Sequence, residues 1–234
     1  MIRWLERRWS DVCARTVGSN SFWFIAVDHR SARRALEPLI DRYARGVVLD
    51  AGAGRLAWRE IIRARASTYL AGDRVLTHNE LSLVCDLSGR LPLRNGSIDT
   101  IFCCSVLEHI PEPWLVLPEF RRVLASGGHV ILSVPFLYYL HGAPHDYFRF
   151  TAYGVVALAR RAGFEVVELR TSGGYAHSLA QALSMLWCAA FWTAKLPSLV
   201  TAPVSLLAAV AHWLDGLDTA GRFRQSVNVV LRPV

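Results

Sequence analysis

Three aspartates stand where short apolar runs end, and a carboxylate in that place can accept hydrogen bonds from a polar ligand. The runs cover residues 47–49, 68–70 and 81–85, and the acids near their ends are Asp50, Asp73 and Asp86. The carboxyl ends of parallel strands meet at one edge of a sheet, where ligands bind in open α/β proteins. Asp73 could accept bonds from two ribose hydroxyls, and Asp86 from an exocyclic amine while Leu87 packs against a purine. Each aspartate alone is more often a turn or cap residue, so their order along the chain is what indicates a site.

The turn after Asp50 contains Gly52 and Gly54. Glycines in such a turn allow close backbone approach to a ligand, and the N–H groups at the start of the following helix are donors for it. A tight strand–helix turn without a ligand is the alternative. Leu56 stands where a third glycine would complete a G-x-G-x-x-G spacing, so this motif alone is a weak signal.

The segment 141–151 follows the fifth of these strands and is rich in side chains that could act on a substrate. His145 could take a proton from an attacking hydroxyl, oriented by Asp146, because histidine titrates in the useful pH range. Tyr147 and Arg149 could position an anionic or polar group, and His141 is a further substrate contact. The alternative is that these residues tie down the loop through hydrogen bonds and stacking.

Other titratable residues carry less information. His109, next to Glu108 at the exit of the run 97–104, is a second catalytic candidate, and a helix-start cap is the alternative. The five cysteines include no CxxC pair. We expect reduced core thiols and neither a metal site nor a disulfide.

Alternating strand and helix patterns predict the elements that position these residues. The expected strands cover 47–49, 68–70, 81–85, 97–104, 130–134, 165–169 and 227–231, and the expected helices 30–45, 56–66, 114–124 (ending at Gly127-Gly128) and 155–162. This alternation predicts a doubly wound, mostly parallel α/β sheet. The expected parts are an N-terminal helical cover (1–45), a core (46–170), an apolar helical insertion (171–225) and a final strand of the core sheet (226–234).

The stretch Val47 to Phe164 resembles the class I S-adenosylmethionine-dependent methyltransferases, in particular the branch that is similar to quinone-biosynthesis methyltransferases. The resemblance rests on an ordered set of motifs in residues 48–54, 69–73, 91–110 and 117–134, and segment 141–151 resembles a "PHDYFRFT" signature found in a subset of these enzymes. It implies a Rossmann-like, seven-stranded fold with S-adenosylmethionine as cofactor. The missing third glycine argues against a nicotinamide dehydrogenase.

The resemblance also implies roles for individual residues. Asp73 would hold the ribose, and Asp86 with Leu87 the adenine. Ser105 and Val106 would form the floor of the site. The residues implied to line the methionine and ribose part are Asp50, Ala51, Gly52 and Gly54.

Two features suggest an amphipathic acceptor. Between Arg170 and Asp215 the only formal charge is Lys195, and the stretches 178–194 and 199–214 are apolar nearly all round. Such stretches suit contact with a membrane surface, true insertion, or burial in the core or a homodimer interface. The N-terminal helix carries arginines and tryptophans, as helices on anionic lipid do. A lipid-linked acceptor is therefore one expectation.

The chain of 234 residues is 53% hydrophobic with a formal charge of +7, which excludes general disorder. Basic charge also suits nucleic acid, but the sequence after residue 104 lacks the Asn/Asp-Pro-Pro-aromatic motif of amino-methylating enzymes.

We expect methyl transfer to a small-molecule, lipid-linked or glycan acceptor, with oxygen favoured. A catalytically silent S-adenosylmethionine-binding partner at a membrane and a nucleic-acid methyltransferase are the alternatives. No secretory signal is recognised, so the expected location is the cytoplasm or the inner face of the membrane.

Overall fold

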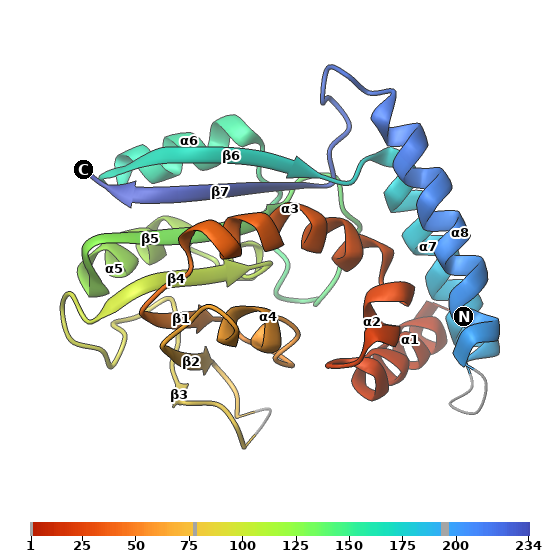
Figure 1. Cartoon of the computed structure of the whole chain (residues 1–234), viewed down its shortest axis with the longest axis horizontal. Coiled ribbons are helices and arrows are strands. Elements are labelled where there is room, and N and C mark those ends of the chain that lie inside the picture. The colour runs from red at the N-terminus through yellow and green to blue at the C-terminus, as the bar shows by residue number, and fades with distance from the viewer. Residues whose placement is uncertain (1, 77–78, 193–196) are drawn as a thin grey trace. The chain divides into compact units, whose positions relative to one another are not determined.

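The computed structural model describes residues 2–76, 79–192 and 197–234, and it divides the chain into two compact units (Figure 1). One unit comprises Ala35–Thr171 and Ser226–Val234, and the other comprises Met1–Arg34 and Ser172–Gln225. The structure thus draws the first boundary after Arg34, inside a helix, where the sequence suggested residue 45. It also joins the N-terminal helices and the apolar insertion into a single unit.

A seven-stranded sheet forms the centre of the larger unit. Its strands lie in the order β3-β2-β1-β4-β5-β7-β6, and β7 runs antiparallel to β5. Their bounds are β1 Val47–Ala51, β2 Thr68–Asp73, β3 Leu83–Val84, β4 Ile98–Cys104, β5 Leu124–Pro135, β6 Phe164–Ser172 and β7 Ser226–Pro233. The predicted class, a mostly parallel Rossmann-like sheet with N-terminal helices and a helical insertion before the last strand, is confirmed.

The central strands are apolar along their length because both faces of the sheet are covered. In β5 every residue from His129 to Val134 is buried, and Ile101 in β4 and Val229 in β7 have no exposed surface. These strands pack with the helices α5 (Val116–Val123) and α6 (Ala152–Arg161) in one core cluster. This rigid sheet holds the strand ends at which the candidate residues lie.

Two helices differ from the predictions. The helix expected over 56–66 is shorter in the structure, where α4 covers Arg59–Arg63. It begins later than expected because Leu56 adopts a φ of 61°, which a right-handed helix does not allow. The helix expected to end at Gly127-Gly128 instead ends at Val123, and both glycines belong to β5. A Cβ on Gly128 would lie 2.8 Å from the Asp99 carbonyl oxygen, so this glycine lets β5 approach β4 closely.

The smaller unit consists of helices. They are α1 (Ile2–Thr16), α2 (Asn20–Ile25), the first turns of α3 (Val27–Tyr43), α7 (Tyr175–Phe191) and α8 (Pro197–Gly216). The sequence suggested a helix from about residue 30 and did not resolve α2 from α3. Ser184 donates a buried hydrogen bond of 2.6 Å to the Ile25 carbonyl, which links α7 to α2.

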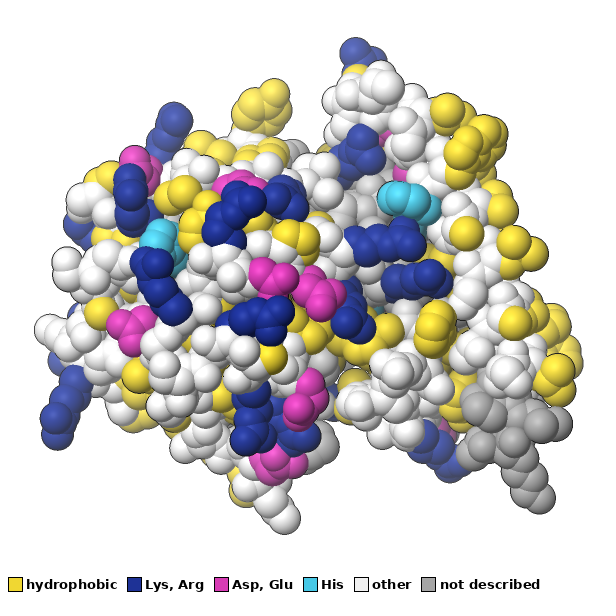
Figure 2. Space-filling view, in the orientation of Figure 1, with side chains coloured by type: hydrophobic (Ala, Val, Ile, Leu, Met, Phe, Trp, Pro, Cys, Tyr) yellow, Lys and Arg dark blue, Asp and Glu magenta, His cyan; other side chains and the backbone are white. Residues whose placement is uncertain are grey.

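The apolar helices α7 and α8 bury one face and expose the other. Ala180, Cys188, Val200 and Val204 lie in the core of the smaller unit, whereas a second set is exposed: Leu179, Leu183, Leu186, Trp187, Phe191, Leu199, Leu206, Val210, Trp213 and Leu214. Figure 2 shows hydrophobic side chains gathered along α8. Residues 198–216 are long and apolar enough to cross a bilayer. Lys195 and residues 193–194 of the predicted apolar stretch lie outside the described residues.

Candidate functional site

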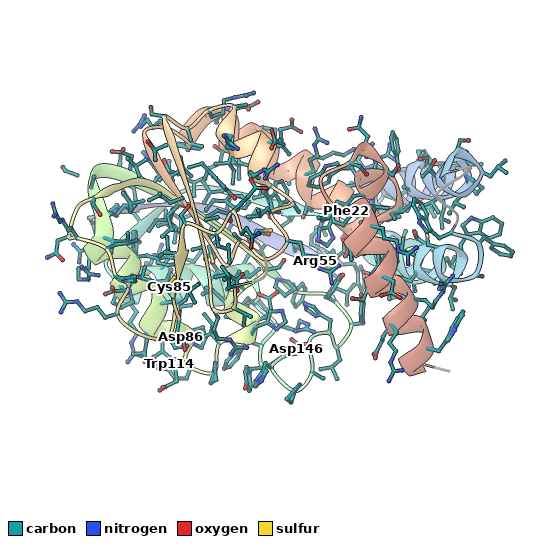
Figure 3. All side chains as sticks on the ribbon, turned by 90° about the horizontal axis from the view of Figure 1, so that it is seen from below. Phe22, Arg55, Cys85, Asp86, Trp114 and Asp146 are labelled. Carbon is teal, nitrogen blue, oxygen red and sulfur yellow. The ribbon has the colours of Figure 1, made fainter. Side chains whose placement is uncertain are left out.

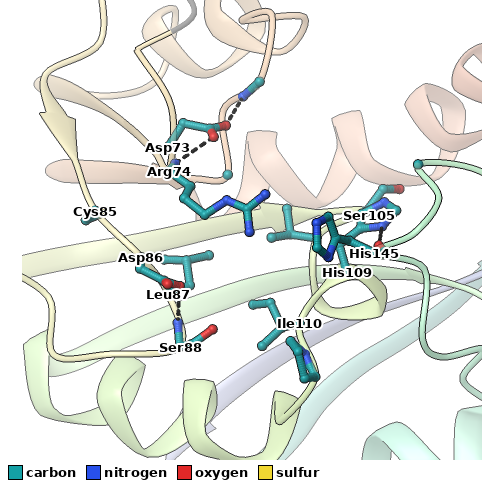
Figure 4. A pocket seen from close by; sticks show the side chains of 15 residues that line it. Asp73, Arg74, Cys85, Asp86, Leu87, Ser88, Ser105, His109, Ile110 and His145 are labelled. Carbon is teal, nitrogen blue, oxygen red and sulfur yellow. Dashed lines mark hydrogen bonds between the residues drawn. The ribbon is translucent and has the colours of Figure 1, made fainter.

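A pocket of about 380 Å³ opens at the carboxyl ends of β1, β2, β3 and β4 (Figure 4). Its size falls within the usual range for small-molecule sites. Seven of the nine residues that the sequence assigned to a cofactor line it: Gly52, Gly54, Asp73, Asp86, Leu87, Ser105 and Val106. The sheet topology therefore brings the ends of four strands together around one cavity.

The glycine turn after β1 forms one wall of the pocket. The N–H groups of Gly52 and Ala53 both donate to the Gly72 carbonyl at the end of β2, at 2.8 and 3.0 Å. Gly52 has a φ of 82°, and a Cβ added there would lie 2.4 Å from the Val106 side chain. Only glycine satisfies both the backbone conformation and this close approach.

Asp73 and Arg74 stand at the end of β2. One oxygen of the Asp73 carboxylate accepts from the Gly54 N–H at 2.7 Å, and the other accepts from the Arg74 N–H at 2.6 Å. A carboxylate oxygen has two acceptor positions, so Asp73 can hold the glycine turn and still accept from a ligand. The Arg74 side chain extends into the pocket (Figure 4). Sequence reasoning missed Arg74, although it directly follows a predicted site residue.

The end of β3 supplies one polar and one apolar group. Asp86 lies in the loop just after β3, next to Cys85 (Figure 3), and accepts from the Ser88 N–H at 2.8 Å. Leu87 is 7% exposed, and together with Ile110 it gives the pocket an apolar wall. This arrangement suits a flat aromatic ring that carries a donor at its edge.

Asp50 and Ala51 are the two predicted cofactor residues that the structure places behind the pocket wall. Asp50 is 3% exposed and accepts a hydrogen bond of 2.7 Å from the Tyr69 hydroxyl. Burial, in part offset by this bond, raises the pKa of Asp50 from 3.8 to about 7. Asp50 and Ala51 point to opposite faces of β1, and both are buried because both faces of the sheet are covered, while the residues that follow the strand line the cavity.

Replacing Asp50 by Asn is expected to flatten the pH dependence of stability between about pH 4 and 7. The folded state holds a proton on Asp50 that the unfolded chain releases at its lower pKa of 3.8. This group therefore stabilises the fold fully below that pKa, and the stabilisation is lost as the pH rises through about 7. Asn cannot ionise and still accepts from Tyr69.

The measurement for Asp50→Asn is the free energy of unfolding in urea at pH 5 and pH 8. Wild type should lose about 2–3 kcal/mol more than the variant over this interval. The surface variant Asp41→Asn should behave like wild type. Parallel profiles for wild type and Asp50→Asn would contradict the assignment.

The end of β4 and the loop after β5 form the opposite wall. Ser105 has a φ of 55°, and its N–H donates to the Ser133 carbonyl at 2.9 Å. The His109 ring lies in a short 3-10 turn, Leu107–His109, rather than at the start of an α-helix. The rings of His109 and His145 both face the pocket (Figure 4).

The loop after β5 is held by its own polar residues. The Tyr147 N–H donates to the Glu108 carbonyl at 2.8 Å, and the His145 carbonyl lies 2.5 Å from Nδ1 of His109. The His145 ring pairs with the Tyr147 hydroxyl at 3.0 Å. His145 is thus positioned as an acid–base candidate at the pocket, with Tyr147 as its partner.

Asp146 does not orient His145, in contrast to the prediction. Its carboxylate accepts from both terminal nitrogens of Arg149, at 2.6 and 2.8 Å, and from the His141 N–H at 2.7 Å. The Arg149 bonds, with smaller contributions from His141, hold the pKa of Asp146 well below its usual range. Arg149 also donates to the carbonyls of Tyr138 and Tyr139. Asp146 and Arg149 therefore tie the loop down, and His141, Asp146, Tyr147 and Arg149 lie outside the pocket lining.

Comparison with known proteins agrees with this geometry. Residues 49–132 match the model of a methyltransferase domain. A ubiquinone biosynthesis O-methyltransferase of Cupriavidus pinatubonensis is 33% identical over 92 residues, which cover 32% of this chain and 37% of the relative. The aligned part thus spans less than half of that relative's own length.

Solved structures share the fold over most of the chain. A geranyl diphosphate methyltransferase in complex with SAM superposes with a TM-score of 0.59, at 12% identity, over 93% of this chain and 92% of that one. The [4+2]-cyclase SpnF superposes with a TM-score of 0.56, at 17% identity, over 85% and 80%. Residues 49–132 thus resemble a methyltransferase domain, and the chain shares its fold with solved S-adenosylmethionine-dependent methyltransferase structures.

Proposed function

We propose that the protein is an S-adenosylmethionine-dependent methyltransferase. The observation that carries the proposal is the convergence of the glycine turn, Asp73 and Asp86 on one pocket within a matched methyltransferase domain. The residues present fit the cofactor: Asp73 offers acceptors for a ribose diol, Asp86 accepts from an amine, and Leu87 packs against a purine. Gly52 and Gly54 leave room for the chain that carries the sulfonium.

When bound, S-adenosylmethionine supplies a methyl group already activated on a positively charged sulfur. The protein's task is to hold the acceptor in line with that methyl group and to exclude water, which lowers the barrier by orientation. His145 stands at the pocket and would take the proton of an acceptor hydroxyl. This favours oxygen as the acceptor atom.

The smaller unit favours one class of methyl acceptor, namely a small molecule that is lipid-linked or part of a glycan. Its helices α7 and α8 expose many apolar side chains, and α1 exposes Arg7, Arg8 and Arg15. An apolar face with arginines nearby suits an anionic membrane surface. We propose a cytoplasmic location with peripheral contact at the inner face of the membrane. Burial of the same face in a homodimer is the competing arrangement.

The same fold is compatible with a second candidate function, a catalytically silent partner. The fold is shared with a protein whose activity is a [4+2] cyclisation, so the fold alone does not require methyl transfer. A silent partner that binds S-adenosylmethionine would keep the pocket without turnover. Nothing in the pocket favours the nucleic-acid alternative.

The test of the proposed function is calorimetric titration of the purified chain with S-adenosylmethionine and S-adenosylhomocysteine, followed by transfer of a labelled methyl group to lipid, glycan and small-molecule fractions. Binding of S-adenosylmethionine together with formation of a labelled product supports the methyltransferase proposal. Binding without label in any fraction supports the silent partner, and absence of binding by folded protein contradicts both.

The membrane proposal predicts flotation of the full chain with vesicles that contain anionic lipid. Leu206→Glu combined with Trp213→Glu should weaken the apparent affinity for vesicles more than about tenfold, because each side chain buried in lipid contributes about 1.5–3 kcal/mol. Tyr153→Glu is the control, because it changes an even more exposed aromatic on α6 of the other unit. Wild type that stays in the soluble fraction at low salt would contradict membrane contact.

A further inference from the structure

Three ligand-type side chains meet beside the pocket. Glu108 and His109 belong to the 3-10 turn after β4, and His141 belongs to the loop after β5. Their ligand atoms all lie within 4.8 Å of one another. One oxygen of the Glu108 carboxylate lies 3.8 Å from Nε2 of His109 and 3.8 Å from Nε2 of His141. The two imidazole rings meet edge to face at 4.8 Å.

Glu108 has a buried side-chain carboxyl group whose polar atoms are left unsatisfied. Its side chain has no exposed surface, and neither oxygen has a hydrogen-bond partner among the residues that the structure describes. A buried carboxylate without partners costs several kcal/mol, so such groups in folded proteins are paired or coordinate a metal.

The two histidines turn lone pairs, rather than donors, toward this carboxylate. Nδ1 of His109 lies 2.5 Å from the His145 carbonyl oxygen, and Nδ1 of His141 lies 3.3 Å from the Tyr139 carbonyl oxygen. A carbonyl only accepts, so each Nδ1 is the donor and each neutral ring keeps its lone pair on Nε2. Metal-bound histidines have this arrangement, in which the second ring nitrogen donates to a carbonyl or carboxylate.

The cluster is also held together by backbone contacts. The Tyr147 N–H donates to the Glu108 carbonyl, which docks the loop on the turn that carries Glu108 and His109. A Cβ on Gly142 would lie 3.0 Å from the His109 ring, so this glycine permits the close approach of the loop. Asp146, 3.4 Å from Nδ1 of His141, supports that ring from behind.

We propose that Glu108, His109 and His141 bind one divalent transition-metal ion of the zinc class. Two imidazoles and one carboxylate are a ligand set of catalytic zinc and of non-haem iron sites, which keep an open position for another ligand. Ligands about 2.1 Å from a tetrahedral ion lie about 3.4 Å apart. The separations of 3.8 Å come within small side-chain movements of that value.

The ion would stand at the edge of the proposed active site, because His109 and Gly142 line the pocket. A hydroxyl group of the acceptor would bind at the open coordination position, and the ion would lower the pKa of that hydroxyl group. This last role rests on the proposed methyltransferase function, whereas metal binding itself does not.

The test is metal titration of tag-free protein in the absence of S-adenosylmethionine. We expect one Zn²⁺ per chain by elemental analysis after dialysis. We also expect Co²⁺ to bind with the intense visible absorption of a low-coordinate nitrogen and oxygen site. Mg²⁺ should not compete, because it prefers an all-oxygen shell. Glu108→Gln and His141→Ala should each weaken Zn²⁺ binding by about 100-fold or more, beyond the loss typical of an outer-shell partner.

His145→Ala is the matched control, because it removes a nearby imidazole but keeps the carbonyl that accepts from His109. Its Zn²⁺ affinity should stay within about tenfold of wild type. Circular dichroism verifies that each variant is folded, and Glu108→Gln is expected to fold because it removes a buried charge. The proposal is overturned if folded wild type binds no stoichiometric Zn²⁺ or Co²⁺, or if Glu108→Gln and His141→Ala bind them as wild type does. Titration with S-adenosylmethionine is a separate readout, so failure of either proposal is recognised independently.

Discussion

Asp73→Ala is expected to weaken S-adenosylmethionine binding by at least about 100-fold in calorimetric titration. The substitution removes the acceptors for two ribose hydroxyls, and a hydrogen bond to a charged group contributes about 1.5–3 kcal/mol. It also removes the acceptor for the Gly54 N–H, which leaves the glycine turn without its contact to the Asp73 side chain. Both effects act on the same pocket wall, so the loss exceeds that of a single contact.

One further variant separates these effects of Asp73, and a second serves as a control. Asp73→Asn keeps one carbonyl oxygen for the Gly54 N–H but loses the charge, and we expect a smaller loss of about tenfold. Asp41→Ala removes a surface aspartate that pairs with Arg65, and it should bind S-adenosylmethionine as wild type does. Unchanged affinity in folded Asp73→Ala would remove this residue from the cofactor site.

Gly52→Ala is expected to have the second-largest effect. The new Cβ would lie 2.4 and 2.9 Å from the two methyl groups of Val106, so rotation of the valine does not relieve the clash. The φ of 82° adds strain for any residue with a Cβ. Overpacking and backbone strain cost about 1–3 kcal/mol each. We expect S-adenosylmethionine affinity to fall by about 30-fold or more and the thermal midpoint to fall with it.

The double variant Gly52→Ala with Val106→Ala tests the steric cause of this effect. Removing the two methyl groups should restore about 1–2 kcal/mol of the loss, while the backbone strain remains. Val106→Ala alone should change binding only slightly. If the double variant is no better than Gly52→Ala, the cost lies in the backbone conformation and not in the contact with Val106.

The sequence alone predicted the sheet and most of the cofactor-type pocket. Buried strands of a parallel sheet are continuous apolar runs; Asp86 directly follows such a run, and Asp73 stands three residues after another. Because parallel strands end at one edge, chain order was enough to place both acids at one cavity. Gly52 was also predictable, because only glycine suits the turn that it occupies.

Local signals failed where a side chain's partner is remote or its direction depends on fine backbone geometry. Asp50 directly follows an apolar run, as Asp86 does, yet it is buried and bonded to Tyr69. Leu56 looked helical, but the turn requires a left-handed conformation there. Neither outcome changes the hydrophobic pattern, so periodicity contains no information about it.

Only the tertiary structure decided which polar residues meet. Asp146 stands next to His145 in the sequence but pairs with Arg149, and Glu108 and His141 come together although a whole helix and strand separate them. Such contacts depend on how the loop after β5 docks on the turn after β4, through backbone bonds that any residue could make. Apolar runs and glycines therefore encode the scaffold locally, whereas the chemistry at its edge is set by long-range docking of the loops.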